Sequence, residues 1–320
     1  MKLKKVIRAG FKYIFDSEYR FLNDANRGKY NNLDDETFIK RKFRAEMGYD
    51  IDLEHPKTFN EKLNWLKLYD RNPEYSRLVD KFAVKKYVAE RIGEKYVIPL
   101  IGGPWYSFDE IPLDTLPQQF VLKTSHDCGG VYLCKDKSSF DADKARKFLT
   151  SHLNRDYYLT GREWPYKNVK PCIFAEEYMS DVGDSDQLTD YKFFCFDGQV
   201  KALFVATDRQ RKNAETKFDF FDVNFSHLPI VQGHPNADRQ IECPPTFEKM
   251  KELASELSRG FPELRVDFYN VGNQIYFGEL TLFHFSGFVP FVPSQWDLKF
   301  GEWINLPDKK LSDTSASDKK

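Results

Sequence analysis

The feature that most constrains the fold of this chain is a pair of strand-like runs near its C-terminus. Residues 264–268 and 275–281 are rich in β-branched and aromatic side chains, and the stretch 270–274 between them reads Asn-Val-Gly-Asn-Gln. Such runs joined by a short segment with Asn and Gly predict a β-hairpin. The chain is therefore expected to contain an antiparallel ribbon at this point.

The register of this hairpin decides which side chains face each other. Pairing the strands symmetrically about Asn273 places Asp267 opposite Glu279 and Arg265 opposite Thr281. Because strand side chains alternate between the two faces, these four side chains share one face. The other face points into a core with Val266, Phe268, Leu280 and Leu282.

Two carboxylates that face each other repel, so their pairing is costly unless cations or phosphates lie between them. With an arginine alongside, the arrangement suits a magnesium–phosphate site, because Mg²⁺ takes one or two carboxylates and completes its shell with water and phosphate oxygens. The alternative is a solvated ladder of cross-strand ion pairs on an exposed hairpin. A bulge in the loop would also shift the register and separate the two acids.

Composition limits the classes of protein to consider. The chain has 320 residues, of which 41% are hydrophobic and 30% are charged, so it is long enough for two or three subdomains. Its net charge of −1 argues against nucleic-acid binding, which favours a basic excess. The five cysteines include no C-x-x-C spacing, and the sequence has no H-E-x-x-H, G-x-S-x-G or Walker-type motif. These features predict a cytoplasmic protein without a disulfide framework or a zinc site.

The first eleven residues, Met1–Phe11, are basic and partly apolar. Charges interrupt the apolar stretch too often for a signal peptide or a membrane-spanning helix. We expect a helix that docks on the rest of the protein. The alternative is an amphipathic helix that touches an anionic membrane, which would place the protein at the inner face of that membrane.

The remaining pattern predicts helices interspersed among strands. A capping box formed by Thr58 and Glu61 starts one helix, and a second helix, over 78–92, ends at Gly93. Further helices are predicted over 141–153 and 245–259, and strands over 97–100, 119–124, 131–134, 172–179, 191–196 and 200–206. The dipeptide Asp197-Gly198 predicts a tight turn between the last two of these strands. Single helices among runs of strands indicate an α+β fold with mostly antiparallel sheets.

We divide the chain into five segments on this basis. A helical N-terminal region covers 1–57, and an α/β part covers 58–118, up to a connector rich in proline. Residues 119–180 and 181–308 form two successive α+β parts, of which the second carries the acidic hairpin. Residues 309–320 are rich in Ser, Asp and Lys, which predicts a disordered tail.

A loop with two glycines, residues 125–130, lies between two predicted strands. Successive backbone N–H groups in such a turn form a concave anion site, and Gly129 and Gly130 let the backbone approach a phosphate. Lys123, two residues before the loop, is within reach of the same phosphate. The alternative is an ordinary hairpin turn.

Three other stretches offer polar side chains to a nucleotide. The strand at 172–179 ends in a run of polar and flexible residues, Glu176, Glu177, Tyr178 and Met179. If the strand leaves its sheet there, these residues face an adenine amino group and a ribose; the alternative is a buried strand that ends in solvated acids. Lys192 lies among aromatic residues and either points at an anion or extends along apolar surface. Arg209, after the following strand, is a further candidate for phosphate binding.

In this order, the elements resemble the ATP-grasp superfamily, and most of all its TupA-like branch, which is named after a teichuronopeptide-biosynthesis protein and associated with bacterial surface polysaccharides. The resemblance covers about residues 55–307. Its most specific runs are Phe-Val-Leu-Lys at 120–123, Ala-Glu-Glu-Tyr at 175–178, Asp-Tyr-Lys-Phe-Phe-Cys-Phe at 190–196 and Gly-Glu-Leu-Thr at 278–281.

The resemblance implies an ATP-grasp fold with two α+β subdomains that grip ATP between them, preceded by the helical N-terminal region. By it, the phosphates are bound by Lys123 and Lys192 and covered by the loop residues Ser125, His126, Gly129 and Gly130. Adenine and ribose are held by Glu176, Glu177, Tyr178 and Met179, and Mg²⁺ is held by Asp267, Glu279 and Thr281. The superfamily usually has Asn where Thr281 stands, and the Thr hydroxyl offers an oxygen in its place. Arg265 steadies an acyl phosphate and the tetrahedral state that follows it.

The function implied by the resemblance is an ATP- and Mg²⁺-dependent carboxylate–amine ligase that forms an amide through an acyl phosphate. The lack of a credible Ser, Cys or His triad agrees with this reaction, because it needs charge neutralisation more than a protein nucleophile. Family context implies a uronic acid of a capsular polysaccharide or O-antigen precursor as the carboxylate, and an amino acid or related amine as the nucleophile. Residues 283–287 then line the acceptor side, with His284 either structural or catalytic.

Two other classes of function remain open at this point. Asp-x-Asp runs at 50–52, 141–143 and 184–186 are of the kind that chelates a metal diphosphate in a nucleotide-sugar glycosyltransferase. A nucleotide-binding scaffold without catalysis is the other class, although the set of Arg265, Asp267 and Glu279 counts against it. The sequence leaves the oligomeric state open.

Overall fold

The computed structural model describes residues 12–180, 188–209 and 215–309, which divide into two units. The first unit contains the chain up to Arg71, Tyr158–Trp164 and the chain from Phe283, and the second contains Asn72–Tyr157 and Pro165–Leu282. The five segments drawn on the sequence divide the chain differently and stay predictions. The expected helix over 1–11 and the tail beyond residue 309 lie outside the described residues.

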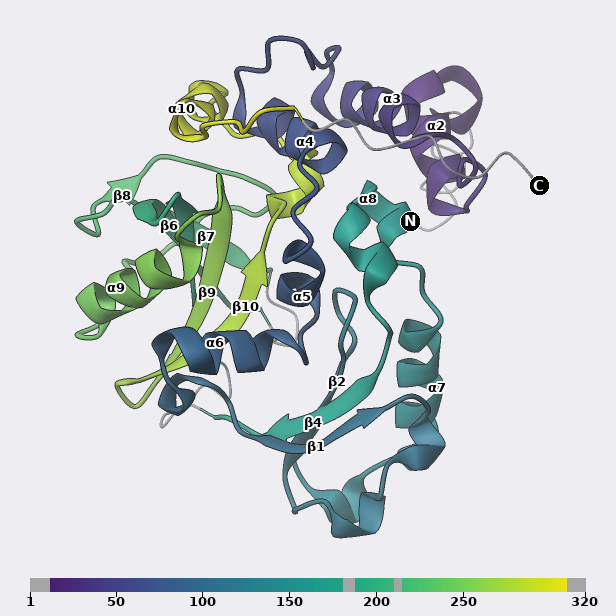
Figure 1. Ribbon diagram of the computed structural model, residues 1–320, viewed down its shortest axis with the longest axis vertical. Coiled ribbons are helices and arrows are strands. Elements are labelled where there is room, and N and C mark those ends of the chain that lie inside the picture. The colour runs from purple at the N-terminus through teal and green to yellow at the C-terminus, as the bar shows by residue number, and fades with distance from the viewer. Residues whose placement is uncertain (1–11, 181–187, 210–214, 310–320) are drawn as a thin grey trace. The chain divides into compact units, whose positions relative to one another are not determined.

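Helices make up most of the first unit (Figure 1). They are α2 (Ser17–Asn26), α3 (Asp35–Met47), α4 (Phe59–Tyr69), α8 (Tyr158–Gly161), α10 (Gln295–Trp303) and the short 3₁₀ helix η6 (His284–Gly287). The predicted capping box of α4 is confirmed: the Thr58 hydroxyl accepts from the Glu61 N–H at 3.1 Å, and the Glu61 carboxylate accepts from the Thr58 N–H at 3.0 Å.

Aromatic rings and two polar contacts of a buried lysine hold the first unit together. The Phe59 ring lies 5.9 Å from the Phe291 ring and 5.7 Å from the Phe300 ring. The ammonium group of the buried Lys67 donates to the backbone oxygens of Gly161 and Ser286, both at 2.8 Å. Lys67 thereby ties α8 to η6, the segment that begins three residues after the acidic hairpin ends.

The second unit contains two antiparallel sheets. The smaller sheet has the order β1 (Leu100–Trp105), β4 (Ile173–Glu177), β2 (Phe120–Thr124) and β3 (Val131–Cys134). Helix α7 (Ala142–Leu153) packs on β2 and β3 with Ala145 and Leu149, which are fully buried. Burial of this one apolar stripe of α7 against the sheet forms a core under β2 and β4.

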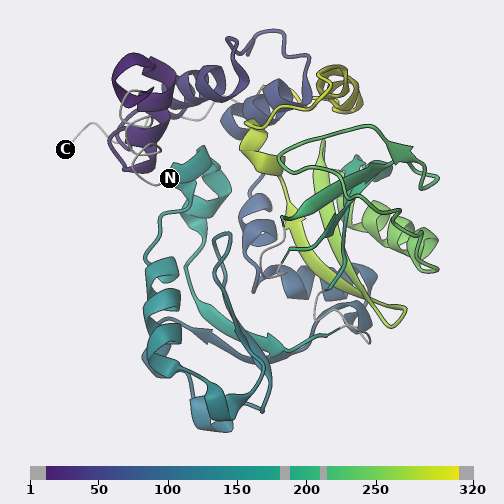
Figure 2. The same cartoon turned by 180° about the vertical axis from the view of Figure 1, so that it is seen from behind.

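The larger sheet carries the predicted hairpin at one edge. Its order is β10 (Gln274–Thr281), β9 (Leu264–Val271), β5 (Asp190–Phe196), β6 (Gln199–Thr207), β7 (Lys217–Phe221) and β8 (His227–Leu228). Helix α9 (Phe247–Ser258) packs on β5, β6 and β9, α6 (Val84–Ile92) contacts α9, and α5 (Tyr75–Val79) contacts β10 (Figures 1 and 2). Short 3₁₀ helices occur in the connections at Glu94–Tyr96, Phe108–Glu110, Leu113–Thr115, Lys137–Ser139 and Trp164–Asn168.

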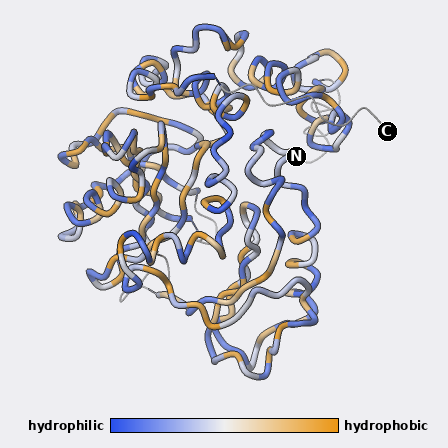
Figure 3. Tube along the Cα trace, viewed as in Figure 1, coloured by the Kyte–Doolittle hydropathy of each residue, from blue (hydrophilic) through white to orange (hydrophobic). Residues whose placement is uncertain are grey.

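The pairing of all named strands is antiparallel, which confirms the predicted α+β class. Along the helices and strands the trace alternates between hydrophobic and hydrophilic residues (Figure 3), as expected for elements with one face in a core. No strand was predicted at β7 or β8, whose runs are short. None of the helices described is long and apolar enough to cross a membrane.

The predicted helix over 78–92 is wrong, because the chain breaks between α5 and α6. The side chain of Asp80 accepts hydrogen bonds from the backbone N–H groups of Phe82 at 2.9 Å and Ala83 at 3.1 Å. An Asp that binds its own following backbone competes with helical hydrogen bonding and favours a turn. The predicted end at Gly93 is confirmed.

The acidic hairpin has the predicted facing pairs, but its turn and the register next to the turn differ from the prediction. Its turn is only Gly272-Asn273, with φ of 54° and 64°, and the strands therefore extend further than predicted. From Val271↔Gln274 to Phe268↔Phe277 the pairing is offset by one residue from the predicted register. A bulge at Gly278 then restores it, so that Asp267 pairs with Glu279 and Arg265 with Thr281.

Candidate functional site

A cavity of about 350 Å³ lies within the second unit, and residues of both of its sheets line it. This volume is in the range of small-molecule sites. The lining includes most of the predicted site residues, namely Lys123, Gly129, Glu176, Glu177, Tyr178, Met179, Lys192, Arg209, Asp267 and Glu279. The structure therefore brings the loop 125–130 with Lys123, the three other polar stretches and the hairpin to one place.

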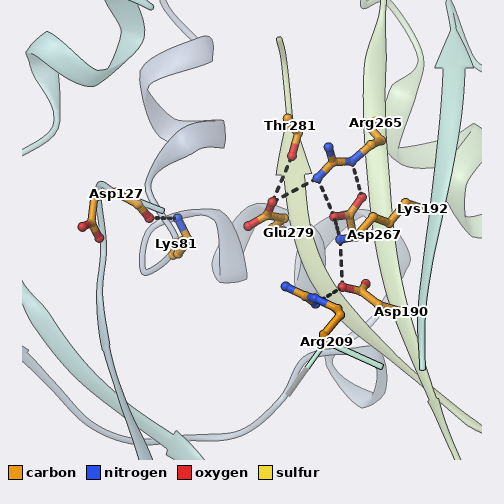
Figure 4. A network of polar contacts seen from close by, with 9 residues as sticks. All are labelled: Lys81, Asp127, Asp190, Lys192, Arg209, Arg265, Asp267, Glu279 and Thr281. Carbon is orange, nitrogen blue, oxygen red and sulfur yellow. Dashed lines mark hydrogen bonds and ion pairs between the residues drawn. The ribbon is translucent and has the colours of Figure 1, made fainter. Parts of the chain in front are cut away.

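Arg265 lies between the two facing acids of the hairpin (Figure 4). Its Nε and Nη2 atoms donate to the two oxygens of Asp267, each at 2.7 Å, and Nη2 also donates to Glu279 at 3.1 Å. The Thr281 hydroxyl donates to the same Glu279 oxygen at 3.1 Å. The guanidinium thus supplies the positive charge that lets two carboxylates face each other. Arg265 and Thr281 do not line the cavity themselves, but both contact Glu279, which does.

The charged chain continues from the hairpin onto β5. The Lys192 ammonium contacts Asp267, and it lies 2.8 Å from Asp190, which in turn contacts Arg209 (Figure 4). Positive and negative groups therefore alternate along the wall of the cavity. Asp190 also lines the cavity, and its Oδ1 is buried without a hydrogen-bond partner. The sequence analysis gave Asp190 no role at the site, although it lies two residues before Lys192 and hence on the same strand face.

Tyr269 is a second lining residue that the sequence analysis missed. It continues the period of two from Arg265 through Asp267, so strand alternation alone places it on the cavity face. Burial, together with the nearby charge of Asp190, raises the pKa of the Tyr269 hydroxyl well above its ordinary value. Tyr269 therefore stays neutral at physiological pH.

Lys81, between α5 and α6, supplies a cation from the other side of the site. Its Nζ donates to the backbone oxygen of Asp127 at 2.5 Å, and its N–H donates to the backbone oxygen of Ser125 at 2.8 Å (Figure 4). Burial alone would raise the pKa of Glu279, but the charges of Lys81, Lys192 and Arg265 outweigh it and lower that pKa to about 2. Glu279 is therefore an anion at every physiological pH. The sequence analysis did not single out Lys81, because its acceptors on the loop 125–130 are far away in the chain.

Glu176 is a buried anion between two lysines. Its carboxylate contacts Lys85 and Lys123, and only 3% of the residue is exposed. Burial would raise the pKa of Glu176, but the two ammonium groups lower it below its ordinary value. Lys85 also donates to the backbone oxygen of Ile98 at 2.8 Å. The strand β4 ends at Glu177, so Tyr178 and Met179 leave the sheet beside the cavity as the sequence suggested.

The loop 125–130 presents only part of its length to the cavity. Cys128 and Gly129 line the cavity, whereas Ser125, His126 and Gly130 do not. The Ser125 hydroxyl accepts from the Cys172 N–H at 3.1 Å, and His126 Nε2 lies 2.9 Å from the backbone oxygen of Arg155. These two side chains hold the loop in place from behind.

The donor set fits a magnesium ion that is shared with phosphate. Asp267 and Glu279 line the cavity, and 39% of the Glu279 side chain is exposed there. Among the described residues, no group of three or more His, Cys, Asp and Glu side chains is placed to hold a metal ion by itself. Two carboxylates match the one or two that Mg²⁺ takes from a protein, with water and phosphate oxygens completing its shell.

A profile of the family described as TupA-like ATPgrasp matches residues 61–305 of this chain. No curated protein sequence matches the chain. Among solved structures, similarity is found to D-alanine–D-alanine ligase from Helicobacter pylori, with 14% identity, a TM-score of 0.42, and coverage of 77% of this chain and 69% of that one.

Two N5-carboxyaminoimidazole synthases are also similar. The Staphylococcus aureus structure has 17% identity and a TM-score of 0.37, and the match covers 72% of this chain and 53% of that one. The Aspergillus clavatus structure, in complex with ADP and 5-aminoimidazole ribonucleotide, has 14% identity and a TM-score of 0.37, with coverage of 66% and 46%. The chain spans about half the length of these two structures.

Proposed function

The chain belongs to the TupA-like family of ATP-grasp enzymes, and from this premise we propose that it is an ATP- and Mg²⁺-dependent carboxylate–amine ligase. The observation that carries the proposal is the hairpin site, where Arg265 joins two ionised acids beside a cavity lined by several lysines. Cations on both sides of the cavity, together with two acids placed to hold Mg²⁺, suit a bound polyphosphate.

In the proposed reaction, a carboxylate oxygen of the acceptor attacks the terminal phosphorus of ATP, and ADP leaves. The amine nitrogen then attacks the acyl carbon of the resulting acyl phosphate, and phosphate leaves as the nitrogen loses a proton. Lys81, Lys123 and Lys192 neutralise the phosphate charge in both steps, and Arg265 stabilises the negative charge that develops at the acyl group.

Asp267 and Glu279 would hold the magnesium ion, with the Thr281 hydroxyl fixing the orientation of Glu279. The ion supplies charge neutralisation to the phosphate oxygens of ATP. Because Arg265 and Lys192 already neutralise Asp267, the hairpin keeps its geometry without relying on the ion. Cys128 and Gly129 would cover the phosphates, and Glu177, Tyr178 and Met179 would flank the adenosine.

The family supports a proposal for the substrates. We propose that the enzyme acts in surface-polysaccharide synthesis, with a uronic acid of a capsular or O-antigen precursor as the carboxylate and an amino acid or related amine as the nucleophile. The enzyme would act in the cytoplasm, and the basic residues among 1–11 would allow contact with the inner face of an anionic membrane.

The glycosyltransferase alternative loses its support in the described residues. Asp52 is used in a turn, where it accepts from the N–H groups of Glu54 and His55, and Asp141 caps α7. Neither run lines the cavity. The third run, 184–186, lies outside the described residues.

The proposal is tested by incubating the pure protein with ATP, Mg²⁺, a hexuronic acid and a mixture of amino acids. ADP is followed in a coupled assay, and the amide is sought by mass spectrometry. We expect ADP release that needs both the acid and the amine. Binding of ATP without substrate-dependent ADP across a panel of uronic acids would contradict the ligase assignment, and consumption of a nucleotide sugar without ATP would point to the transferase.

A further inference from the structure

The loop 125–130 is built around one buried carboxylate, that of Asp127, which is 1% exposed. Its Oδ1 accepts from the hydroxyl of Thr124 at 2.5 Å, and its Oδ2 contacts Nδ1 of His152 on α7. Because a carboxylate oxygen accepts, Nδ1 of His152 carries the proton in this contact. Asp127 therefore joins the end of β2 to the last turn of α7 through one side chain.

The backbone of the same residue holds the cation on the other side of the site. Lys81 Nζ donates to the backbone oxygen of Asp127, and Lys81 is the cation that lowers the pKa of Glu279 most strongly. Cys128 and Gly129, which face the cavity, follow Asp127 directly. The conformation of Asp127 thus sets both the position of Lys81 and the path of the cavity-facing part of the loop.

Gly130 shows how closely the loop is folded around this carboxylate. A Cβ atom built on Gly130 would lie 1.7 Å from the Thr124 hydroxyl oxygen and 2.6 Å from Oδ1 of Asp127. No side chain fits between them, so glycine at 130 is a condition for the Thr124–Asp127 bond. The sequence analysis gave Gly130 the role of letting the backbone approach phosphate, whereas the structure gives it this second role inside the loop.

We propose that Asp127 and His152 are positioning residues of the nucleotide site, which hold the loop 125–130 in the shape that covers the terminal phosphates. The inference rests on the proposed function, because it needs ATP in the cavity. The strongest support comes from His152, which lies on α7 and does not line the cavity. Its contact with Asp127 ties the loop to a helix that packs on the sheet. The ring of Phe148, 4.5 Å from that of His152, keeps the imidazole in place.

The test compares ATP, which has the terminal phosphates that the loop would cover, with AMP, which lacks them. Affinities for Mg²⁺–ATP and for AMP are measured by competition against a fluorescent adenine nucleotide, with the full-length protein and its His152→Ala variant. A hydrogen bond to a charged group contributes enough that its loss should weaken ATP binding about tenfold. AMP binding should stay within about twofold of wild type, because AMP lacks the outer phosphates.

Three further variants make the result specific. His152→Asn offers an amide N–H near the position of Nδ1 and should restore ATP binding to within about threefold of wild type. Thr124→Val keeps the shape of the side chain but removes the hydroxyl, so it probes the other end of the carboxylate if His152→Ala fails to fold. Lys147→Ala, at an exposed position of the same helix, is the matched control and should bind both nucleotides as wild type does.

Each outcome decides between the two proposals. Wild-type affinity for ATP in folded His152→Ala and Thr124→Val would overturn the positioning role and leave the proposed function standing. Equal losses for ATP and AMP would also overturn it, since they would show general damage to the site. Failure of the wild-type protein to bind ATP would overturn the proposed function, and this inference with it.

Discussion

Arg265 binds both oxygens of Asp267 through its Nε and Nη2 atoms, each at 2.7 Å. The same guanidinium reaches Glu279, so a single side chain holds the two acids of the hairpin in one geometry. Lysine cannot reproduce this fork, because an ammonium group is a single point of charge. The consequences for activity follow from that difference.

We expect Arg265→Lys to lower kcat by about a hundredfold or more, the effect of removing one preorganised donor from a developing charge. The KM for ATP should change much less, since Lys81, Lys123 and Lys192 remain. Steady-state ADP release at varied ATP checks both constants. A variant that keeps kcat and loses only ATP affinity would show that Arg265 serves binding and not the chemical steps.

We expect Glu279→Gln to abolish turnover and leave the fold intact. The substitution keeps the shape of the side chain but removes the negative charge offered to Mg²⁺. ADP release measures the first effect and thermal unfolding the second. Retained turnover would remove the metal assignment from this residue.

We expect Lys81→Ala to raise the pKa of Glu279 from its value of about 2, because Lys81 is the strongest of the charges that lower it. The acid limb of Mg²⁺–nucleotide binding should therefore move to higher pH in the variant, and affinity at neutral pH should fall. Titrations from about pH 2 to pH 6 measure the shift, because they cover the range between the lowered pKa of Glu279 and the ordinary glutamate pKa of about 4.3. Lys86→Ala on α6, whose side chain is 81% exposed, is the matched control and should show no shift.

We expect Gly278→Ala to disturb the bulge in β10. A Cβ atom at this position would lie 3.1 Å from the backbone oxygen of Asp267 and 3.3 Å from the Tyr269 ring. Overpacking of this kind costs about 1–3 kcal/mol of stability, and the shift should separate Asp267 from Glu279. Urea unfolding and ADP release report the two effects. Unchanged activity with unchanged stability would show that the strand accommodates the methyl group.

We expect the stability of the protein to fall as pH rises through a range set by Glu263. Both oxygens of this buried carboxyl lack hydrogen-bond partners, and burial raises its pKa well above the ordinary value. In that range the folded state keeps a proton that the unfolded state has lost, so unfolding becomes more favourable with each rise in pH. Above the ordinary glutamate pKa of about 4.3, Glu263→Gln should unfold with a shallower pH dependence than wild type. Identical pH profiles for the two proteins would contradict the assignment.

The hairpin shows what local sequence could and could not predict. Period-two alternation placed Arg265, Asp267, Glu279 and Thr281 on one face, and the facing pairs are confirmed. The pairing between the turn and Gly278 was not predictable. The turn is shorter than expected, which shifts the register by one residue, and a bulge at Gly278 reverses the shift. A bulge depends on close packing against a partner strand, which strand propensity does not encode.

Two of the residues missed by the sequence analysis, Lys81 and Lys85, share a physical reason. They act through partners far away in the chain, namely the backbone oxygen of Asp127 for Lys81 and the carboxylate of Glu176 for Lys85. A lysine at the start of a helix looks like a solvated residue until the tertiary fold brings an acceptor to it. The break of the helix at Asp80 is similar, since the pattern of apolar residues continues through it.

The buried position of Glu176 between Lys85 and Lys123 means that these lysines already have a resident counter-anion. A ligand must compete with this internal anion for the two ammonium groups. Singly charged ions such as chloride carry too little charge to displace it, whereas a triphosphate offers several oxygens at once. The cavity should therefore discriminate by the number of negative charges on its ligand, and simple salts should inhibit nucleotide binding only weakly.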